Sequence, residues 1–109
     1  MIALIEDNRD AIVDLCRQYG VKKLAVFGSA AKDTFDPETS DIDLVLDFED
    51  YGPGVSHRFI YFGDALEQLF GRSVDFVFER KLSNPFFRQE VLSTMQVIYQ
   101  DGRREPAVA

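Results

Sequence analysis

The sequence predicts an α/β fold, in which a small mixed β-sheet of at least three strands has helices packed on one side. Apolar residues recur at three- and four-residue spacing in helical stretches, and short apolar runs lie between them. With 109 residues, 46% hydrophobic and 28% charged, the composition is that of one globular domain. We expect residues 1–100 to form this domain and residues 101–109 to be a flexible tail.

Composition also excludes several classes of protein. No apolar run reaches the roughly 18 residues of a membrane span, and the first residues lack the pattern of a signal peptide. A formal net charge of −7 argues against general nucleic-acid binding, which depends on Lys and Arg. The single cysteine, Cys16, is expected in the core, and His57 on the surface. One cysteine cannot form an internal disulfide, so a cytoplasmic location is expected, and a core this small allows for an oligomer.

The first half of the chain reads as helix, strand and loop. Residues 6–19 have helical periodicity, and Gly20 is a typical stop after a helix. Residues 23–27 are a short apolar run, which indicates a buried strand. The polar residues 32–40 are expected to form a loop, with one helical turn after Ser29.

The second half begins with the clearest strand, residues 41–48, in which polar and apolar side chains alternate. Ser56 can cap a helix over residues 56–70, and Gly71 can end it. Residues 74–78 are a third apolar run, expected to be a strand.

A last helix is expected at residues 86–95, followed by an apolar segment at 97–99. Some apolar side chains near the two later helices do not belong to an obvious core stripe. They either complete the core or form one docking patch for a partner: Ile60, Tyr61, Phe86 and Phe87.

Asp41 and Asp43 are the most informative acidic residues. Their spacing of two in a strand places both carboxylates on one side, roughly 6 to 7 Å apart. Asp75 starts another apolar strand and joins them if the two strands are adjacent. Three carboxylates so placed repel one another unless cations lie among them, and carboxylates suit Mg²⁺, or Mn²⁺ in its place.

Gly28 and Ser29, at the end of the first strand, form a second candidate element. Glycine lets the backbone approach a phosphate closely, and the amides and hydroxyl that follow can donate to its oxygens. Lys32 could add a positive charge. Either pair alone is also typical of an ordinary turn or a solvated strand end, so the combined pattern carries the prediction.

That combination resembles a known family. Residues 26–29 (Val-Phe-Gly-Ser) and 40–45 (Ser-Asp-Ile-Asp-Leu-Val) resemble the signature of the polymerase-β-like nucleotidyltransferase superfamily. Residues 73–77 (Ser-Val-Asp-Phe-Val) are similar to the strand with its third acidic residue. The short chain resembles the minimal nucleotidyltransferase (MNT) branch over roughly residues 5–100.

The resemblance implies the polymerase-β-like fold and transfer of a nucleoside monophosphate, AMP from ATP, to a hydroxyl. Asp41 and Asp43 would hold two Mg²⁺ ions, and Asp75 would bind the ion beside the attacking hydroxyl and assist its deprotonation. Gly28 and Ser29 would hold the phosphates, with Lys32 nearby.

The implied acceptor is a protein. Short MNT chains resemble antitoxins that transfer AMP to a HEPN-domain ribonuclease toxin and silence it. Two alternatives stay open: an antitoxin of the same fold that acts by binding alone, which the loop after Ser29 favours because it lacks the family's arginines, and the catalytic subunit of a small-molecule nucleotidyltransferase.

Overall fold

The computed structural model describes residues 2–31 and 41–101 and contains one four-stranded sheet of order β3-β2-β1-β4. Strand β1 pairs antiparallel with β2 and with β4, whereas β3 pairs parallel with β2. The sheet is therefore mixed, and the predicted α/β class is confirmed. The strands are β1 (Val21–Phe27), β2 (Ile42–Phe48), β3 (Val74–Phe78) and β4 (Gln96–Gln100).

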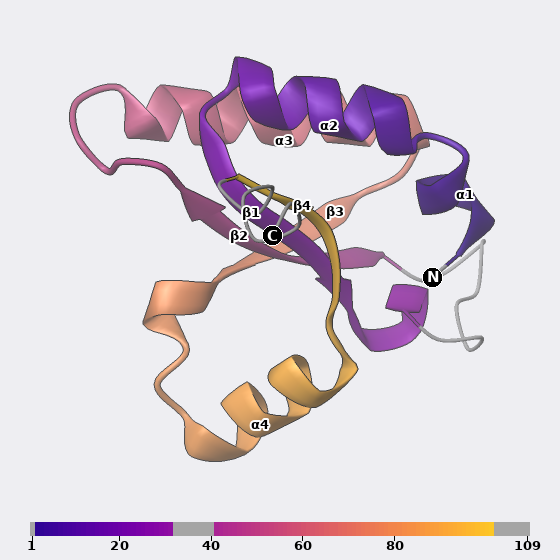
Figure 1. Cartoon of the computed structure of the whole chain (residues 1–109), viewed down its shortest axis with the longest axis vertical. Coiled ribbons are helices and arrows are strands. Elements are labelled where there is room, and N and C mark those ends of the chain that lie inside the picture. The colour runs from indigo at the N-terminus through magenta and orange to yellow at the C-terminus, as the bar shows by residue number, and fades with distance from the viewer. Residues whose placement is uncertain (1, 32–40, 102–109) are drawn as a thin grey trace, which may run out of the picture.

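Helices cover the sheet unequally. Figure 1 shows α2 and α3 over one face of the sheet and α4 on the other. The long pair agrees with the expectation of helices on one side of the sheet. For α4 that expectation was wrong, because its buried residue Val91 clusters with Ala25, Phe27 and Val45 on the opposite face. The α-helices are α1 (Ala3–Glu6), α2 (Arg9–Gln18), α3 (Val55–Phe70) and α4 (Pro85–Thr94), and the short 3₁₀ turns are η1 (Gly28–Ala31) and η2 (Glu79–Lys81).

Alternation along β2 separates two apolar clusters. Its residues Ile42, Leu44, Leu46 and Phe48 are buried in the larger core, beneath α2 and α3. Its residue Val45 points to the other face and belongs to the smaller cluster. The period-two prediction for this strand is therefore confirmed. The smaller cluster has Ala25, Phe27, Val45, Leu82 and Val91 as its buried members.

Two of the expected helix boundaries were wrong. The helix expected at 6–19 is α2, which begins later, at Arg9, and ends at Gln18. A separate short helix, α1, precedes it, and the Asn8 side-chain amide, between the two helices, donates to the Leu4 carbonyl at 2.8 Å. Ser56 does not cap α3; the N-cap is Gly54, whose φ of +89° suits glycine.

The last strand and two single residues lie where the sequence predicted them. The apolar segment at 97–99 is part of β4, and its pairing with β1 completes the sheet. Cys16 is buried, which raises the pKa of its thiol to about 12, and His57 is exposed. The expected loop at 32–40 and tail residues 102–109 lie outside the described residues. None of the described helices has the length and apolar character needed to cross a membrane.

Candidate active site

Strand pairing brings Asp43 and Asp75 together. Parallel pairing of β2 with β3 makes these two residues direct partners across the strands, so their backbones lie about 5 Å apart. The Ile42 amide donates to the Ser73 carbonyl at 3.2 Å, and the Val74 amide to Glu67 Oε2 at 3.0 Å. These two bonds tie the start of β3 to β2 and to α3, and so hold Asp75 beside Asp43.

The three predicted carboxylates share an electrostatic environment in which no described cation forms an ion pair with them. Asp41, immediately before β2, and Asp75 are exposed, whereas Asp43 is half-buried. Burial, followed by the charges of Asp75 and then Asp41, raises the pKa of Asp43 above its usual value of 3.8. None of the ion pairs between described residues includes any of the three. The site therefore has an excess of negative charge that a cation would relieve.

The turn after β1 lies directly against this acidic site. Phe27, the last residue of β1, is the partner of Asp43 across the strands. Gly28 follows with φ +69°, and a Cβ placed on it would lie only 3.0 Å from Asp43 Oδ2. Glycine is needed here both for the backbone conformation and for the close approach to the carboxylate. Ser29 is the next residue, in the backbone of η1.

Two contacts that the sequence analysis did not find anchor η1. The Gln96 side-chain amide, from β4, donates to the Ala31 carbonyl at 3.2 Å, and the Ile2 amide donates to the Ala30 carbonyl at 3.1 Å. Both alanines are buried. The space at these two positions of η1 therefore suits small apolar side chains and not charged ones. The only sequence signal for Gln96 was a polar residue beginning an apolar strand.

The structure thus brings Gly28, Asp43 and Asp75 into one place, with Asp41 at its edge. Lys32 lies outside the described residues. Within residues 2–31 and 41–101, no three acidic, His or Cys side chains are arranged closely enough to hold a metal ion. The donor type fits Mg²⁺, since all three groups are carboxylates, but exposed Asp41 and Asp75 would have to reorient to bind one.

A glycine turn at the end of one strand, facing carboxylates on two neighbouring strands, is suited to binding a phosphate through backbone amides and divalent cations. On a small mixed sheet this arrangement defines a nucleotidyltransferase. The chain belongs to that family, because the family model described as "Nucleotidyltransferase domain" matches residues 9–98.

Individual relatives agree with the family. Two proteins of Methanocaldococcus jannaschii, each named "Putative protein adenylyltransferase", are 34% identical over 77 residues and 32% identical over 78. The first alignment covers 71% of this chain and 76% of the relative, and the second covers 72% and 76%.

Solved structures show the same fold. A structure described as a "putative minimal nucleotidyltransferase" is 34% identical, with a TM-score of 0.70, and the alignment covers 87% of this chain and 95% of that one. The resemblance to the MNT branch is thereby confirmed. An MNT antitoxin solved in complex with the tri-AMPylated HEPN toxin of Shewanella oneidensis is 17% identical, with a TM-score of 0.60, and covers 94% and 77%. At that identity it shows a shared fold.

Proposed function

We propose that this protein is an adenylyltransferase that transfers AMP from ATP to a hydroxyl of a partner protein. The relatives named as protein adenylyltransferases support the choice of AMP and of a protein acceptor. The observation that carries the proposal is the direct pairing of Asp43 with Asp75, beside the backbone of Gly28.

The transfer would proceed in a single exchange of bonds. The acceptor oxygen forms a bond to the α-phosphorus of ATP, the bond from that phosphorus to the β-phosphate oxygen breaks, and pyrophosphate leaves. Asp75 would accept the proton of the acceptor hydroxyl. Its exposed carboxylate, on the edge strand β3, supports this role. The amides of Gly28 and Ser29 would donate to the phosphate oxygens, with Lys32 as a further cation.

Divalent cations fit this proposal through the charge of the site. Asp41, Asp43 and Asp75 would hold Mg²⁺. Burial of Asp43, together with the charges of Asp75 and Asp41, raises the pKa of Asp43, and these neighbouring negative charges support the assignment. When bound, Mg²⁺ would neutralise the developing charge on the phosphate oxygens and on the attacking hydroxyl.

For the acceptor we propose a HEPN-domain toxin, with this chain as its antitoxin. Support comes from the neighbouring structure in which an MNT antitoxin accompanies an AMPylated HEPN toxin. A protein acceptor also fits a chain with a net charge of −7, which would repel RNA.

The test is to purify the chain together with a candidate HEPN-domain partner, to add ATP and Mg²⁺, and to measure the intact mass of the partner. We expect a gain of one or more AMP groups with the parent chain and none with Asp43→Asn. Asp47→Asn, on the same face of the same strand, is the matched control and should still modify the partner. A stable complex without any gain in mass would instead assign the chain to binding alone, and would contradict the proposal.

A further inference from the structure

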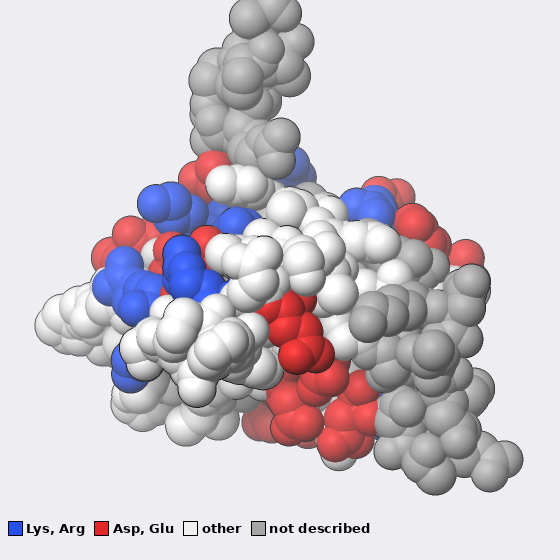
Figure 2. All heavy atoms as spheres, turned by 90° about the horizontal axis from the view of Figure 1, so that it is seen from below, with Lys and Arg blue, Asp and Glu red and all other residues white. Residues whose placement is uncertain are grey.

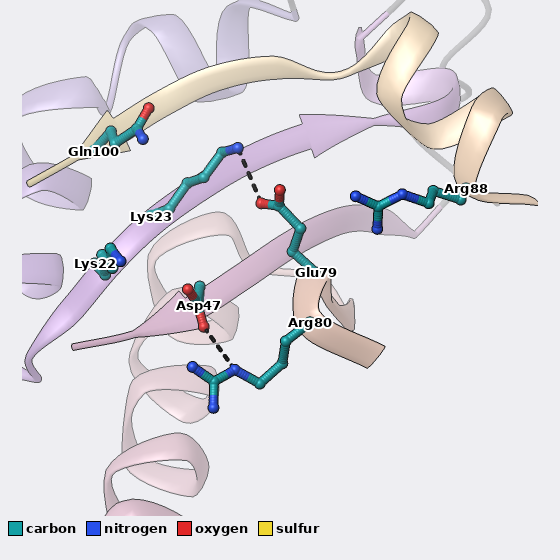
Figure 3. A pocket seen from close by; sticks show the side chains of 7 residues that line it. All are labelled: Lys22, Lys23, Asp47, Glu79, Arg80, Arg88 and Gln100. Carbon is teal, nitrogen blue, oxygen red and sulfur yellow. Dashed lines mark ion pairs between the residues drawn. The ribbon is translucent and has the colours of Figure 1, made fainter. Parts of the chain in front are cut away.

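A polar groove lies at the other end of the sheet from the acidic site. It has a volume of about 440 Å³ and is formed by side chains of β1, β2, β4, η2 and α4. Figure 3 shows Lys22 and Lys23 on β1, Arg80 on η2 and Arg88 on α4 around it. Four cations from three elements therefore converge in a chain whose net charge is −7.

Ion pairing inside the groove leaves two of these cations available. Lys23 Nζ lies 2.9 Å from Glu79 Oε1, and Arg80 Nε lies 3.5 Å from Asp47 Oδ1. These pairs engage both carboxylates of the groove. Lys22 and Arg88 are exposed, and neither belongs to an ion pair with another described residue; the Arg88 guanidinium donates only a long bond, 3.4 Å, to the Leu82 carbonyl. The groove thus has one cation on β1 and another on α4 that form no ion pair within residues 2–31 and 41–101.

Helix α4 also has an exposed aromatic side chain, Phe86, which lies two residues before Arg88 and does not line the groove. Val91 is its only buried residue, whereas Phe86 is 86% exposed and Phe87 42%. Phe87 has a partial partner in an edge-to-face contact with Phe27, 6.2 Å between ring centroids. An aromatic ring as exposed as Phe86 is a typical anchor for a partner. The docking patch expected from the sequence is therefore divided, because Ile60 and Tyr61 lie on α3, on the other face of the sheet.

We propose that Lys22 and Arg88 form a docking surface for an acidic segment of the acceptor protein, with its carboxylates on the two cations, and that Phe86, outside the groove on α4, gives the same partner an apolar contact. The proposal rests on the proposed function, since it names the chemistry by which the acceptor is recognised. Two observations support it: the two cations complement the charge of an acidic segment, and an exposed apolar side chain, Phe86, lies on the same helix as Arg88.

The position of the groove relative to the acidic site favours a protein over a nucleic acid as its ligand. Asp47, in the groove, and Asp43, in the acidic site, lie on the same face of β2, roughly 13 Å apart along the strand. One protein surface can span that distance and reach both sites. A polynucleotide would carry its phosphates across an acidic patch, which Figure 2 shows on the α4 side of the molecule, apart from the clustered Lys and Arg.

The experiment uses a fluorescein-labelled peptide of repeated Glu-Glu-Leu and follows its binding to the full chain by fluorescence anisotropy. Lys22→Glu/Arg88→Glu should weaken binding about tenfold, and Phe86→Ala should weaken it severalfold. Arg17→Glu/Lys81→Glu is the matched control, because it changes the net charge equally at two exposed positions outside the groove. This control should bind within about twofold of the parent.

Three results would overturn the proposal. The first is equal weakening by both double variants, which would show a general effect of charge. The second is equal binding of a Gln-Gln-Leu peptide. The third is an oligothymidylate that binds the parent more tightly than the peptide does and is no longer bound by Lys22→Glu/Arg88→Glu but is still bound by the control. That result would assign the groove to nucleic acid. Asp43→Asn should bind the peptide like the parent, so failure of transfer and failure of docking can be distinguished.

Discussion

Asp43 and Asp47 lie on the same face of β2, but their surroundings are opposite. Asp47 accepts a hydrogen bond from the Tyr51 hydroxyl and pairs with the Arg80 guanidinium, which also stacks over the Tyr51 ring at 3.7 Å. Asp43 is flanked by the charges of Asp75 and Asp41 and by the backbone of Gly28. Among the described residues, Asp47 has both a hydrogen-bond donor and a cation as partners, whereas the charges that act on Asp43 are negative.

The difference separates a structural carboxylate from a functional one. Burying or crowding a charge without a partner costs stability, and such costs are typical of binding and catalytic sites. Nothing in the packing of the smaller cluster needs an acid at position 43, because its apolar neighbour Val45 already fills that face. The acidic pair Asp43 and Asp75 is therefore the part of the molecule to which the proposed divalent cation is assigned.

The largest expected effect is on catalysis. Asp43→Asn should reduce nucleotidyl transfer from labelled ATP at least about 1,000-fold, because the substitution removes a negative charge from the proposed cation site. The transfer activity of Asp47→Asn should stay within about fivefold of the parent. The Asp47 carboxylate has its hydrogen bond with Tyr51 and its ion pair with Arg80, and neither partner lies in the acidic site. Comparable loss in both variants would show that the two carboxylates do not differ in role.

A second contrast uses two glycines that have the same φ of +69°, Gly28 and Gly71. Alanine at either position should lower the free energy of unfolding by about 1–2 kcal/mol, since both adopt the left-handed conformation. Only at Gly28 would the new Cβ meet Asp43 Oδ2, whereas nothing lies within 4 Å of a Cβ at Gly71.

Transfer activity should therefore fall about 100-fold in Gly28→Ala and be nearly unchanged in Gly71→Ala, when both are assayed at a temperature where they are folded. Equal activities in the two variants would show that the close approach at Gly28 is unimportant for the reaction.

These contrasts also show how far the sequence could predict the molecule. Alternation of Ile42, Leu44 and Leu46 with Asp43 was enough to define β2 and the side on which its acids lie, because a period of two is a local property. The position of Asp75 beside Asp43 could be predicted only on the condition that their two strands are neighbours in the sheet. It depends on which strand pairs with β2, and that choice is made by the parallel crossover through α3.

Features assembled from many elements were beyond the sequence. The groove cation Lys22 is far along the chain from Arg80 and Arg88, and no spacing rule relates it to them. Helix α4 has one buried residue, so its apolar pattern could not indicate which face of the sheet it covers. Gln96 was missed because its contact with η1 is set by the position of β4.

A third prediction concerns the stability of the parent fold. Asp47→Asn should lower the free energy of unfolding by about 1–2 kcal/mol, because it weakens a charge-assisted hydrogen bond from Tyr51 and an ion pair with Arg80 in a partly buried setting. Urea unfolding followed by circular dichroism measures it. Tyr51→Phe should lose a similar amount, and the double variant should lose less than the sum of the two. Simple additivity would argue against a direct interaction.

The smallest expected effect has the opposite sign. Asp43→Asn should raise the free energy of unfolding at pH 7 by a few tenths of a kcal/mol, a value kept small because solvent screens a half-exposed group. The pKa of Asp43 is raised in the folded state, so folding binds a proton between the unfolded value of 3.8 and that raised value. Stability of the parent therefore falls as pH rises through this window, and the advantage of the variant vanishes below it.

Mg²⁺ provides the control for this last effect. A cation bound to the ionised carboxylates stabilises the folded parent by about 1.4 kcal/mol at ten times its dissociation constant, and should stabilise Asp43→Asn much less. The order of stability of the two proteins would then reverse when Mg²⁺ is added. If the parent is less stable than Asp43→Asn both with and without Mg²⁺, this cation does not relieve the repulsion around Asp43.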